Sequence, residues 1–342
     1  MKRLIPLCLA AGALILAGCS SGSSTSSSAA PAAKGKIAKS EHAGGAQITL
    51  SASQTAAVKK AAKGKLIAIV CATMETQYHA TLCNHAKALA ESLGFTSEIF
   101  DAQTDPNREL QGLQDFVSKG AYAILDDSLG GNAVVNEVKQ AIKQGVVVVQ
   151  LTSTEYSAFG AIGVSVDDAT IAAAEGDAAG SYAAQHYGSK TVQLAVTNYP
   201  SIPELVTRAN NIVAAFKAKD PHVHIVGEFL GGTPANGFAS MQTALQKFPD
   251  IQGVVGINDA GNLGAYKALK NAGHTGANTF IFGIDCDPEA VALIKQGNTM
   301  YKGCVDTNPG GTGEIAVRAV AEYLLGQTVP GSISVPVSVF SG

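Results

Sequence analysis

Short apolar runs alternate with amphipathic helical patterns along most of the chain. The runs 66–70, 121–125 and 146–151 are nearly continuous stretches of Val, Ile, Leu and Ala, as expected of strands that are covered on both faces. Between these runs, apolar residues recur with the helical period, and Gly94 and Gly145 mark helix ends. This alternation predicts successive β-α units and parallel sheets.

A second cycle of the same kind begins at Asp167 and Asp168, where a long helical pattern starts. Near the C-terminus, a strand pattern over 300–305, a helical pattern over 313–325 and an extended segment over 333–339 predict that the chain returns to both halves. The predicted fold class is α/β, with two doubly wound parallel-sheet lobes joined by a hinge of several crossings. We expect residues 64–166 with 306–331 in lobe 1, and residues 167–305 with 332–342 in lobe 2.

Polar residues follow two of the predicted strands in the second half. The run 254–257 ends at Asn258 and Asp259, and the run 280–284 ends at Asp285. Open α/β sheets present ligand-binding groups at the C-terminal ends of their strands, and a cleft between two lobes is a common ligand site. An acid at a strand end can also simply cap the next helix. We predict that Asn258 and Asp285 contact a ligand and that Asp259 caps a helix.

The N-terminus has the pattern of an export signal. Lys2 and Arg3 precede an apolar run over 4–16 that is too short to span a bilayer. The run closes with Leu-Ala-Gly and Cys19, which resembles the lipobox of bacterial lipoproteins; the alternative is an ordinary signal peptide with a chance cysteine. We therefore expect a lipoprotein signal peptide over 1–18, a lipid on Cys19, and an exported protein. Its lipid would anchor it to the bacterial cell membrane, with the domain in the periplasm or extracytoplasmic space.

The residues after the lipidation site are of low complexity. Residues 20–31 are almost entirely Ser, Ala, Gly and Thr, a composition that cannot bury a core and predicts a flexible segment. The low complexity continues to about Gly45, and 48–63 could form a strand fragment and a short helix. We assign residues 19–63 to a lipidated tether.

The charge of the chain is mildly acidic. The sequence has 24 Lys and Arg against 27 Asp and Glu, and loss of residues 1–18 removes two basic residues and no acid. No basic cluster remains, which argues against nucleic acid as a partner. No later apolar run approaches membrane-spanning length. We therefore expect the lipid to be the only attachment to the membrane.

The six cysteines divide by position. Cys8 would leave with the signal peptide. Cys286 lies just past one predicted strand and Cys304 lies within the next, so we predict a disulfide between them, which an oxidising compartment permits. Cys71 and Cys83 lie on a strand and on the helix after it, and the sequence leaves their pairing open. No Cys/His spacing indicates a zinc site, and we predict no metal and no cofactor.

Signatures of catalysis are missing from the sequence. It contains no Gly-x-Ser-x-Gly elbow, no His-Glu-x-x-His motif and no phosphate-binding loop. Paired acids in a cleft could serve a glycosidase, but the β-α layout and the exported state are explained without one. We predict that the protein is not an enzyme.

From Lys65 to about Val337 the chain resembles the type I periplasmic binding proteins that serve sugar ABC transporters, especially the ribose-binding branch. The segments that carry this resemblance are GVVGINDAGNLGAYKALKNAG, FIFGIDCDPEAVALIKQG, IAIVCATMETQYH, AILDDSLGGNAVV and DTNPGGTGEIAV. The resemblance implies that a ligand is held between the lobes by groups from the strand ends of both. The positions that match the family's site are Ala72, Thr76, Tyr78, His79, Asp127, Thr152 and Ser153 in lobe 1, Arg208, Asn258 and Asp285 in lobe 2, and Asp306 on the return strand.

Departures from the ribose-binding pattern affect the same site. Where ribose binders carry an Asp-Arg pair this chain has Thr152 and Ser153, and His79 replaces a Phe. The residues that could partly substitute for the missing charged pair and aromatic ring are Glu75, Asp126, Glu155 and Tyr199. The resemblance therefore implies a sugar or sugar-like polyol as the ligand class, without naming the molecule.

Each matched residue also has a structural alternative. Arg208 could form only a surface salt bridge, and Tyr78 and His79 could pack in the first turn of a helix. If the matches hold, the protein is the substrate-binding lipoprotein of an ABC importer and delivers its ligand to the permease. The alternative is a sensory binding protein that presents its ligand-bound form to a chemoreceptor or a sensor kinase. We expect a monomer in either role.

Overall fold

The computed structural model describes residues 34–129, 132–153 and 155–342. The predicted signal peptide, the lipidation site Cys19 and the tether up to residue 33 lie outside the described residues. Among the described residues, none of the helices combines the length and the apolar character needed to cross a membrane.

Lobe 1 is built on a seven-stranded sheet with the strand order β1-β12-β6-β5-β4-β2-β3, in which all neighbours run parallel. Its strands are β1 (Lys36–Gly44), β2 (Leu66–Cys71), β3 (Thr96–Asp101), β4 (Ala123–Asp127), β5 (Val147–Leu151), β6 (Ile162–Ser165) and β12 (Thr328–Ser334). Its helices are η1 (Gly45–Gln47), α1 (Ala52–Ala61), α2 (Gln77–Ser92), α3 (Pro106–Ser118), α4 (Asn132–Lys143), η2 (Glu155–Phe159) and α10 (Pro309–Leu324). Helices α1, α2 and α10 share one hydrophobic core with the sheet, and α3 and α4 share another.

Lobe 2 is built on a six-stranded sheet with the order β13-β11-β10-β9-β7-β8, in which only β13 runs antiparallel to its neighbour. Its strands are β7 (Val192–Asn198), β8 (Val223–Leu230), β9 (Gly253–Gly256), β10 (Phe280–Ile284), β11 (Tyr301–Asp306) and β13 (Ser338–Ser341). Its helices are α5 (Asp168–Tyr187), α6 (Pro203–Lys219), α7 (Pro234–Lys247), α8 (Asp259–Asn271) and α9 (Pro288–Gln296). Helices α5 and α6 cover one face of the sheet, and α7, α8 and α9 cover the other.

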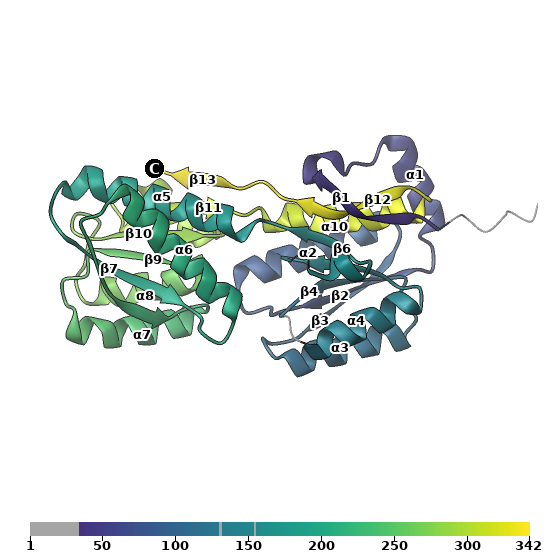
Figure 1. Cartoon of the computed structure of the whole chain (residues 1–342), viewed down its shortest axis with the longest axis horizontal. Coiled ribbons are helices and arrows are strands. Elements are labelled where there is room, and N and C mark those ends of the chain that lie inside the picture. Colours follow the sequence, from purple (N-terminus) through teal and green to yellow (C-terminus); the bar gives the residue numbers. More distant parts are fainter. Residues whose placement is uncertain (1–33, 130–131, 154) are drawn as a thin grey trace, which may run out of the picture. The chain divides into compact units, whose positions relative to one another are not determined.

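The chain crosses between the lobes three times, after β6, after β11 and after β12 (Figure 1). The crossings are short, because only two or three residues separate the elements on either side. The predicted fold class, two doubly wound α/β lobes with a hinge of several crossings, is confirmed. Both sheets direct the C-terminal ends of their parallel strands toward the hinge region, where the polar residues singled out in the sequence lie.

The structure differs from the predicted lobe boundaries at both ends. Residues 36–63 belong to the folded unit and not to the tether, because β1 pairs with β12 and α1 packs on lobe 1. The extended segment expected over 333–339 is divided, since β12 lies in the sheet of lobe 1 and β13 in that of lobe 2. The strand β1 was missed because it is polar, and because the one described strand that it pairs with, β12, comes almost 300 residues later.

Close helix packing holds the segment after β9 in place. A Cβ atom on Gly237 of α7 would lie 2.0 Å from the carbonyl oxygen of Gly261 on α8, so these helices touch through their backbones. The first turn of α8, which begins directly after Asn258, is thereby fixed against α7.

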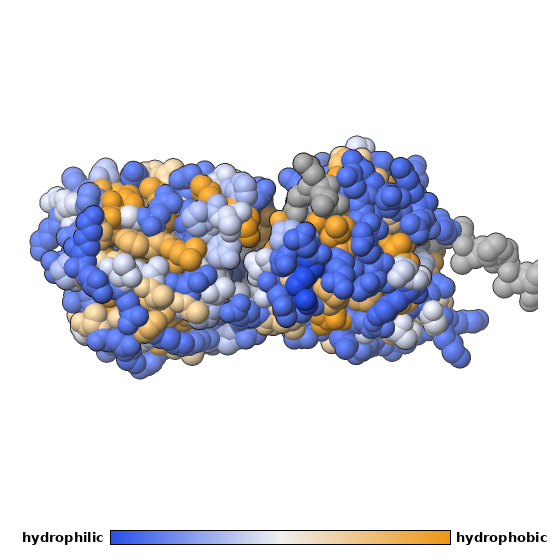
Figure 2. Space-filling model, turned by 90° about the horizontal axis from the view of Figure 1, so that it is seen from below, coloured by the Kyte–Doolittle hydropathy of each residue, from blue (hydrophilic) through white to orange (hydrophobic). Residues whose placement is uncertain are grey.

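Apolar side chains on the visible face form separate patches that do not join into one apolar surface (Figure 2). Among the described residues, the large hydrophobic side chains that are exposed are those of Leu230 and Val339. Scattered apolar residues of this kind are normal on the surface of a folded domain.

Candidate ligand-binding site

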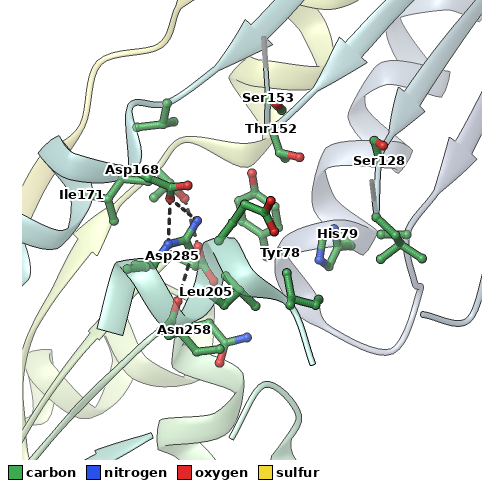
Figure 3. A pocket seen from close by; sticks show the side chains of 18 of the residues that line it. Tyr78, His79, Ser128, Thr152, Ser153, Asp168, Ile171, Leu205, Asn258 and Asp285 are labelled. Atoms are coloured by element: carbon green, nitrogen blue, oxygen red, sulfur yellow. Dashed lines mark hydrogen bonds and ion pairs between the residues drawn. The ribbon is translucent and has the colours of Figure 1, made fainter. Parts of the chain in front are cut away.

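A cavity of about 230 Å³ lies between the two lobes, at the C-terminal ends of their strands (Figure 3). Its size is below the roughly 300 to 1,000 Å³ of pockets for drug-sized ligands, and suits a small molecule. The polar lining residues of lobe 1 are Thr76, Tyr78, His79, Ser128, Gln150, Thr152, Ser153 and Glu155. Those of lobe 2 are Asp168, Glu204, Arg208, Asn258 and Asp285, and the second crossing adds Thr307.

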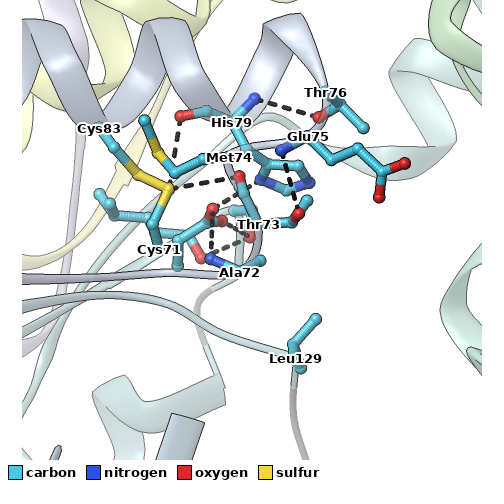
Figure 4. A network of polar contacts seen from close by, with 12 residues as sticks. Cys71, Ala72, Thr73, Met74, Glu75, Thr76, His79, Cys83 and Leu129 are labelled. Atoms are coloured by element: carbon cyan, nitrogen blue, oxygen red, sulfur yellow. Dashed lines mark hydrogen bonds and ion pairs between the residues drawn. A yellow bond between two sulfur atoms is a disulfide. The ribbon is translucent and has the colours of Figure 1, made fainter. Parts of the chain in front are cut away.

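The loop after β2 brings the first group of predicted residues to the cavity. Thr76 caps α2, because its hydroxyl accepts a hydrogen bond from the backbone N–H of His79 (Figure 4). This cap fixes the first turn of the helix, from which Tyr78 and His79 reach the cavity. Burial, followed by the charges of nearby carboxylates, raises the pKa of the Tyr78 phenol well above its usual value, so the hydroxyl stays protonated and able to donate.

Asp127 lies next to His79 but does not line the cavity. This position differs from the prediction that Asp127 contacts the ligand directly. Only 1% of its side chain is exposed. Its Oδ2 lies 2.6 Å from Nδ1 of His79 and accepts a hydrogen bond of 3.2 Å from the backbone N–H of Ala72. Its Oδ1 also accepts a hydrogen bond of 3.5 Å from the hydroxyl of Thr152. The carboxylate therefore orients three parts of the cavity lining: the histidine, the loop after β2 and Thr152.

Asp127 also sets the charge of the histidine. Burial lowers the pKa of His79, but the negative charge and the hydrogen bond of Asp127, together with Asp285, raise it, and the net pKa lies above its ordinary value. His79 therefore carries positive charge over a wider pH range than a free histidine does.

Thr152 follows β5 with a φ of 65°. This left-handed conformation is strained for a β-branched residue. Its hydroxyl donates to the carbonyl oxygen of Leu151 at 2.6 Å. An unfavourable backbone conformation at a cavity wall is typical of functional sites.

Arg208 of α6 faces the cavity from lobe 2 and already has a strong partner. Its Nε and Nη2 both donate to Oδ1 of Asp168, at 2.8 and 2.5 Å, and its Nη1 donates to the carbonyl oxygen of Ile257. The guanidinium group has five N–H donors, so two remain for a ligand. Asp168 was missed as a site residue, because its sequence position at the start of α5 indicates only a helix terminus.

The roles expected for Asn258 and Asp259 are partly exchanged. Asn258 lines the cavity, but it is also the cap of α8: its Oδ1 accepts from the N–H of Gly261 and its Nδ2 donates to the carbonyl of Gly232. Asp259, predicted to be the cap, is fully buried and accepts hydrogen bonds from the hydroxyl of Tyr301 and the backbone N–H of Asp287. The prediction failed because neighbouring residues at a helix start point in different directions.

Asp285 lines the cavity from the end of β10, with a strained φ of 102°. Its Oδ1 accepts a hydrogen bond from the hydroxyl of Thr307 on the second crossing. Asp306, in contrast, does not line this cavity but a separate groove, where it accepts from the N–H of Asn308. Asp306 ends β11 and Thr307 follows it directly, but the two residues line different pockets, which places Asp306 away from the predicted ligand.

Seven of the nine predicted ligand residues thus line one cavity, namely Thr76, Tyr78, His79, Thr152, Arg208, Asn258 and Asp285. Their contact with a ligand stays a prediction. Of the residues named as substitutes for the missing Asp-Arg pair, Glu155 lines the cavity, whereas Glu75, Asp126 and Tyr199 do not. The apolar wall residues Ile171, Ile202 and Leu205 carried no sequence signal that separates them from core residues.

A disulfide lies beside the site in each lobe. Cys71 is bonded to Cys83, which ties the end of β2 to α2 across the loop that carries Thr76. Cys286 is bonded to Cys304, which ties the residue after Asp285 to β11, as the sequence indicated. The two cysteines of lobe 1 and Asp127 form the one group of three potential metal ligands found in the described residues, but disulfide sulfurs do not bind as thiolates.

A buried acid pair lies behind the loop after β4. Asp126 and Glu109 have no exposed surface, and three of their four carboxylate oxygens accept no hydrogen bond from the part of the chain that the structure describes. Burial raises the pKa of Glu109 to about 7 and, together with the Glu109 charge, raises that of Asp126 well above its usual value. The fourth oxygen accepts from the N–H of Leu129, which lines the cavity.

The pair should make the protein less stable as the pH rises. The folded-state pKa of Glu109 is raised from 4.5 to about 7, so the folded state holds a proton that the unfolded state releases in this window. The free energy of unfolding should therefore fall between about pH 4.5 and pH 7, by about 3 kcal/mol. Urea unfolding at pH 5 and pH 8 measures this loss. Glu109→Gln should show a smaller loss than the wild type, whereas Glu41→Gln, at an exposed position on β1, should not. Identical losses in all three proteins would contradict the assignment.

The fold and the site define a class: two-lobed α/β proteins that hold a small molecule between their lobes. A family model described as the periplasmic binding protein domain matches residues 67–328. The chain therefore belongs to the periplasmic binding protein family, and its architecture is that of the type I, ribose-binding-like branch.

Relatives and solved structures agree with this assignment. The chain is 27% identical to the ribose import binding protein of Salmonella typhimurium over 236 residues, 68% of this chain and 76% of that one. It is 28% identical to the D-apiose import binding protein of Actinobacillus succinogenes over 64% of this chain and 69% of that one. A galactofuranose binding protein has a similar fold, with a TM-score of 0.72 and 20% identity over 81% of this chain and 94% of that one. A solute binding protein from Bacillus halodurans with bound myo-inositol has a TM-score of 0.71 and 18% identity, over 82% and 95% of the respective chains.

Proposed function

We propose that the protein is the substrate-binding lipoprotein of an ABC importer and that it binds a sugar or a sugar-like polyol in the cavity between its lobes. The observation that carries this proposal is the cavity itself. Hydrogen-bonding side chains from the strand ends of both lobes converge there, next to the three crossings between the lobes. Relatives named for ribose import and for D-apiose import support the ligand class.

The chemistry of the lining suits a ligand with many hydroxyl groups. Each hydroxyl both donates and accepts, so it can use the free N–H groups of Arg208 and the carboxylate of Asp285 at the same time. The ring of Tyr78 offers a flat apolar surface for the C–H face of a sugar. The hydroxyl groups of Thr152 and Ser153 complete the wall on the side of lobe 1.

Binding would act through the hinge. A ligand that contacts both lobes favours the closed form over the open one, and the closed form is the one that a permease can distinguish. The family places the domain outside the cytoplasm, and a lipid on Cys19 would keep a monomer near the permease. A chemoreceptor or sensor kinase would be served by the same ligand-bound form.

The ligand need not be ribose. Thr152 and Ser153 cannot supply the charges of the Asp-Arg pair of ribose binders, and His79 is tied to Asp127. The ligand classes to compare are therefore pentoses, hexoses and cyclic or open-chain polyols.

A thermal-shift screen of these classes tests the proposal. A ligand at about 100 times its Kd stabilises the folded state by about 2.7 kcal/mol, which raises the Tm by several degrees. Mass spectrometry of the recovered ligand should show it unchanged, which separates binding from turnover. If no pentose, hexose, amino sugar, sugar acid or polyol shifts the Tm, the proposal is wrong.

A further inference from the structure

The inner wall of the site holds more negative than positive groups. Besides the exposed acids Glu155 and Glu204, three carboxylates lie in or directly behind the cavity wall, those of Asp127, Asp168 and Asp285. The cationic groups there are the guanidinium of Arg208 and, when protonated, the imidazole of His79. These three inner carboxylates therefore exceed the two cations by one even when the histidine is charged.

Both cations are already paired. Arg208 donates two hydrogen bonds to Asp168, so the positive charge of the guanidinium balances the negative charge of this carboxylate. His79 is paired in the same way with Asp127, at 2.6 Å. The remaining carboxylate, that of Asp285, has no cation in contact among the described residues, and the hydrogen bond it accepts comes from the neutral hydroxyl of Thr307.

Asp285 is also poorly solvated, since only 8% of it is exposed. Asp287, two residues further along, is 7% exposed, and its side chain has no hydrogen bond or ion pair to any described residue. Burial raises the pKa of Asp285 to about 6, although Arg208 and His79 act against this rise. Burial and the charge of Asp285 raise the pKa of Asp287 to about 7. Both shifts agree with buried carboxylates that have no cation in direct contact among the described residues.

From this arrangement we infer that the ligand is a polyol that carries an ammonium group and that this group binds at Asp285. The inference rests on the proposed function and narrows its ligand class. An ammonium has three donors and one positive charge, so it balances the unpaired carboxylate and hydrogen-bonds to it at once. A neutral polyol leaves that charge unbalanced, and a sugar acid or sugar phosphate adds a second negative charge.

The rim of the cavity has the same sign. Glu155 of η2 and Glu204 of α6 line it from opposite lobes, and both are exposed. Acidic groups around a cleft attract a cation and repel an anion before contact is made. The rim therefore favours the same ligand as the inner wall.

A matched set of sugars tests the inference. Isothermal titration at pH 7 compares glucosamine, glucose, N-acetylglucosamine and glucuronate, and then 1-amino-1-deoxysorbitol, sorbitol and gluconate. The amine of at least one series should bind about tenfold more tightly than its neutral counterpart, because a charge-assisted hydrogen bond replaces a neutral one. The acid of that series should bind more weakly than the neutral form. N-acetylglucosamine separates the effect of charge from that of an added nitrogen.

Two variants locate the ammonium. Asp285→Asn keeps the size of the side chain and removes its charge, and should bring the Kd values of the amine and the neutral form to within about twofold of each other. Glu289→Gln, at an exposed acid at the start of α9 that does not line the cavity, should leave the preference unchanged.

The outcomes distinguish the inference from the function on which it rests. If the neutral forms bind as tightly as their amines, or if an acid binds most tightly, the ligand carries no ammonium group. The proposal that the protein binds a sugar is then unaffected. A preference for the amine that persists in Asp285→Asn overturns the assignment to this residue. The absence of binding by any sugar, charged or neutral, in this set and in the wider screen overturns both.

Discussion

Replacing Arg208 by alanine is expected to weaken ligand binding by about a hundredfold while the protein stays folded. The guanidinium lines the cavity with two N–H donors unused, and hydrogen bonds from a charged group contribute about 1.5 to 3 kcal/mol each. The partner that is left behind, Asp168, has 41% of its side chain exposed, so water can solvate its charge. Titration calorimetry measures the loss, and urea unfolding checks the fold.

The matched control for this variant lies two residues further along the same helix. Asn210 is exposed and does not line the cavity, so Asn210→Ala should bind ligand as the wild type does. An unchanged Kd in Arg208→Ala would mean that the ligand binds elsewhere, and would reduce the arginine to the salt bridge that the sequence left open as an alternative. A variant that fails to unfold cooperatively would show that the Arg208–Asp168 pair is needed for the fold.

Removing the disulfide between Cys71 and Cys83 should lower both stability and affinity. The bond closes a loop with a sequence separation of 12, and in the chain-entropy model a loop of this length stabilises by about 3 kcal/mol. The loop contains Thr76, Tyr78 and His79, so its loosening should also weaken ligand binding, by about tenfold. The double variant Cys71→Ala/Cys83→Ala avoids free thiols and is compared with the wild type by urea unfolding and calorimetry.

The second disulfide provides the comparison. In Cys286→Ala/Cys304→Ala the loop after β2 keeps its bond, so hydrogen exchange of residues 72–79 should stay as in the wild type. In the lobe 1 variant the same residues should exchange faster. Equal exchange in both variants would show that the capped first turn of α2 holds the loop without the disulfide.

The sequence predicted the fold well because the fold is built from repeated local units. Parallel strands that are covered on both faces read as apolar runs, and each helix between them has its own period and its own end signals. The strand ends at Asn258 and Asp285 were therefore found without knowledge of the topology. The edge strand β1 was not found, because its residues are polar and its partner β12 is distant in sequence.

The sequence indicated which residues stand at strand ends, but it indicated less well in which direction their side chains point. Asp127 and Asp306 stand at strand ends as expected, yet one supports His79 and the other faces a separate groove. At a strand end neighbouring residues point to different sides, so a shift of one position decides whether a side chain meets the cavity. Asp168 was missed because its place in the site depends on Arg208, which lies on another helix and 40 residues later in the sequence.

The sequence by itself determined the class of fold, the sheet edge at which a ligand should bind, and the residue types available there, because these depend on local periodicity and on chain order. The tertiary structure decided which of those residues share one cavity, which of them are already paired, and that Asp285 contacts no cation among the residues that the structure describes. These properties depend on distances between side chains far apart in the sequence, and a charge is compensated only by the groups that the fold places next to it.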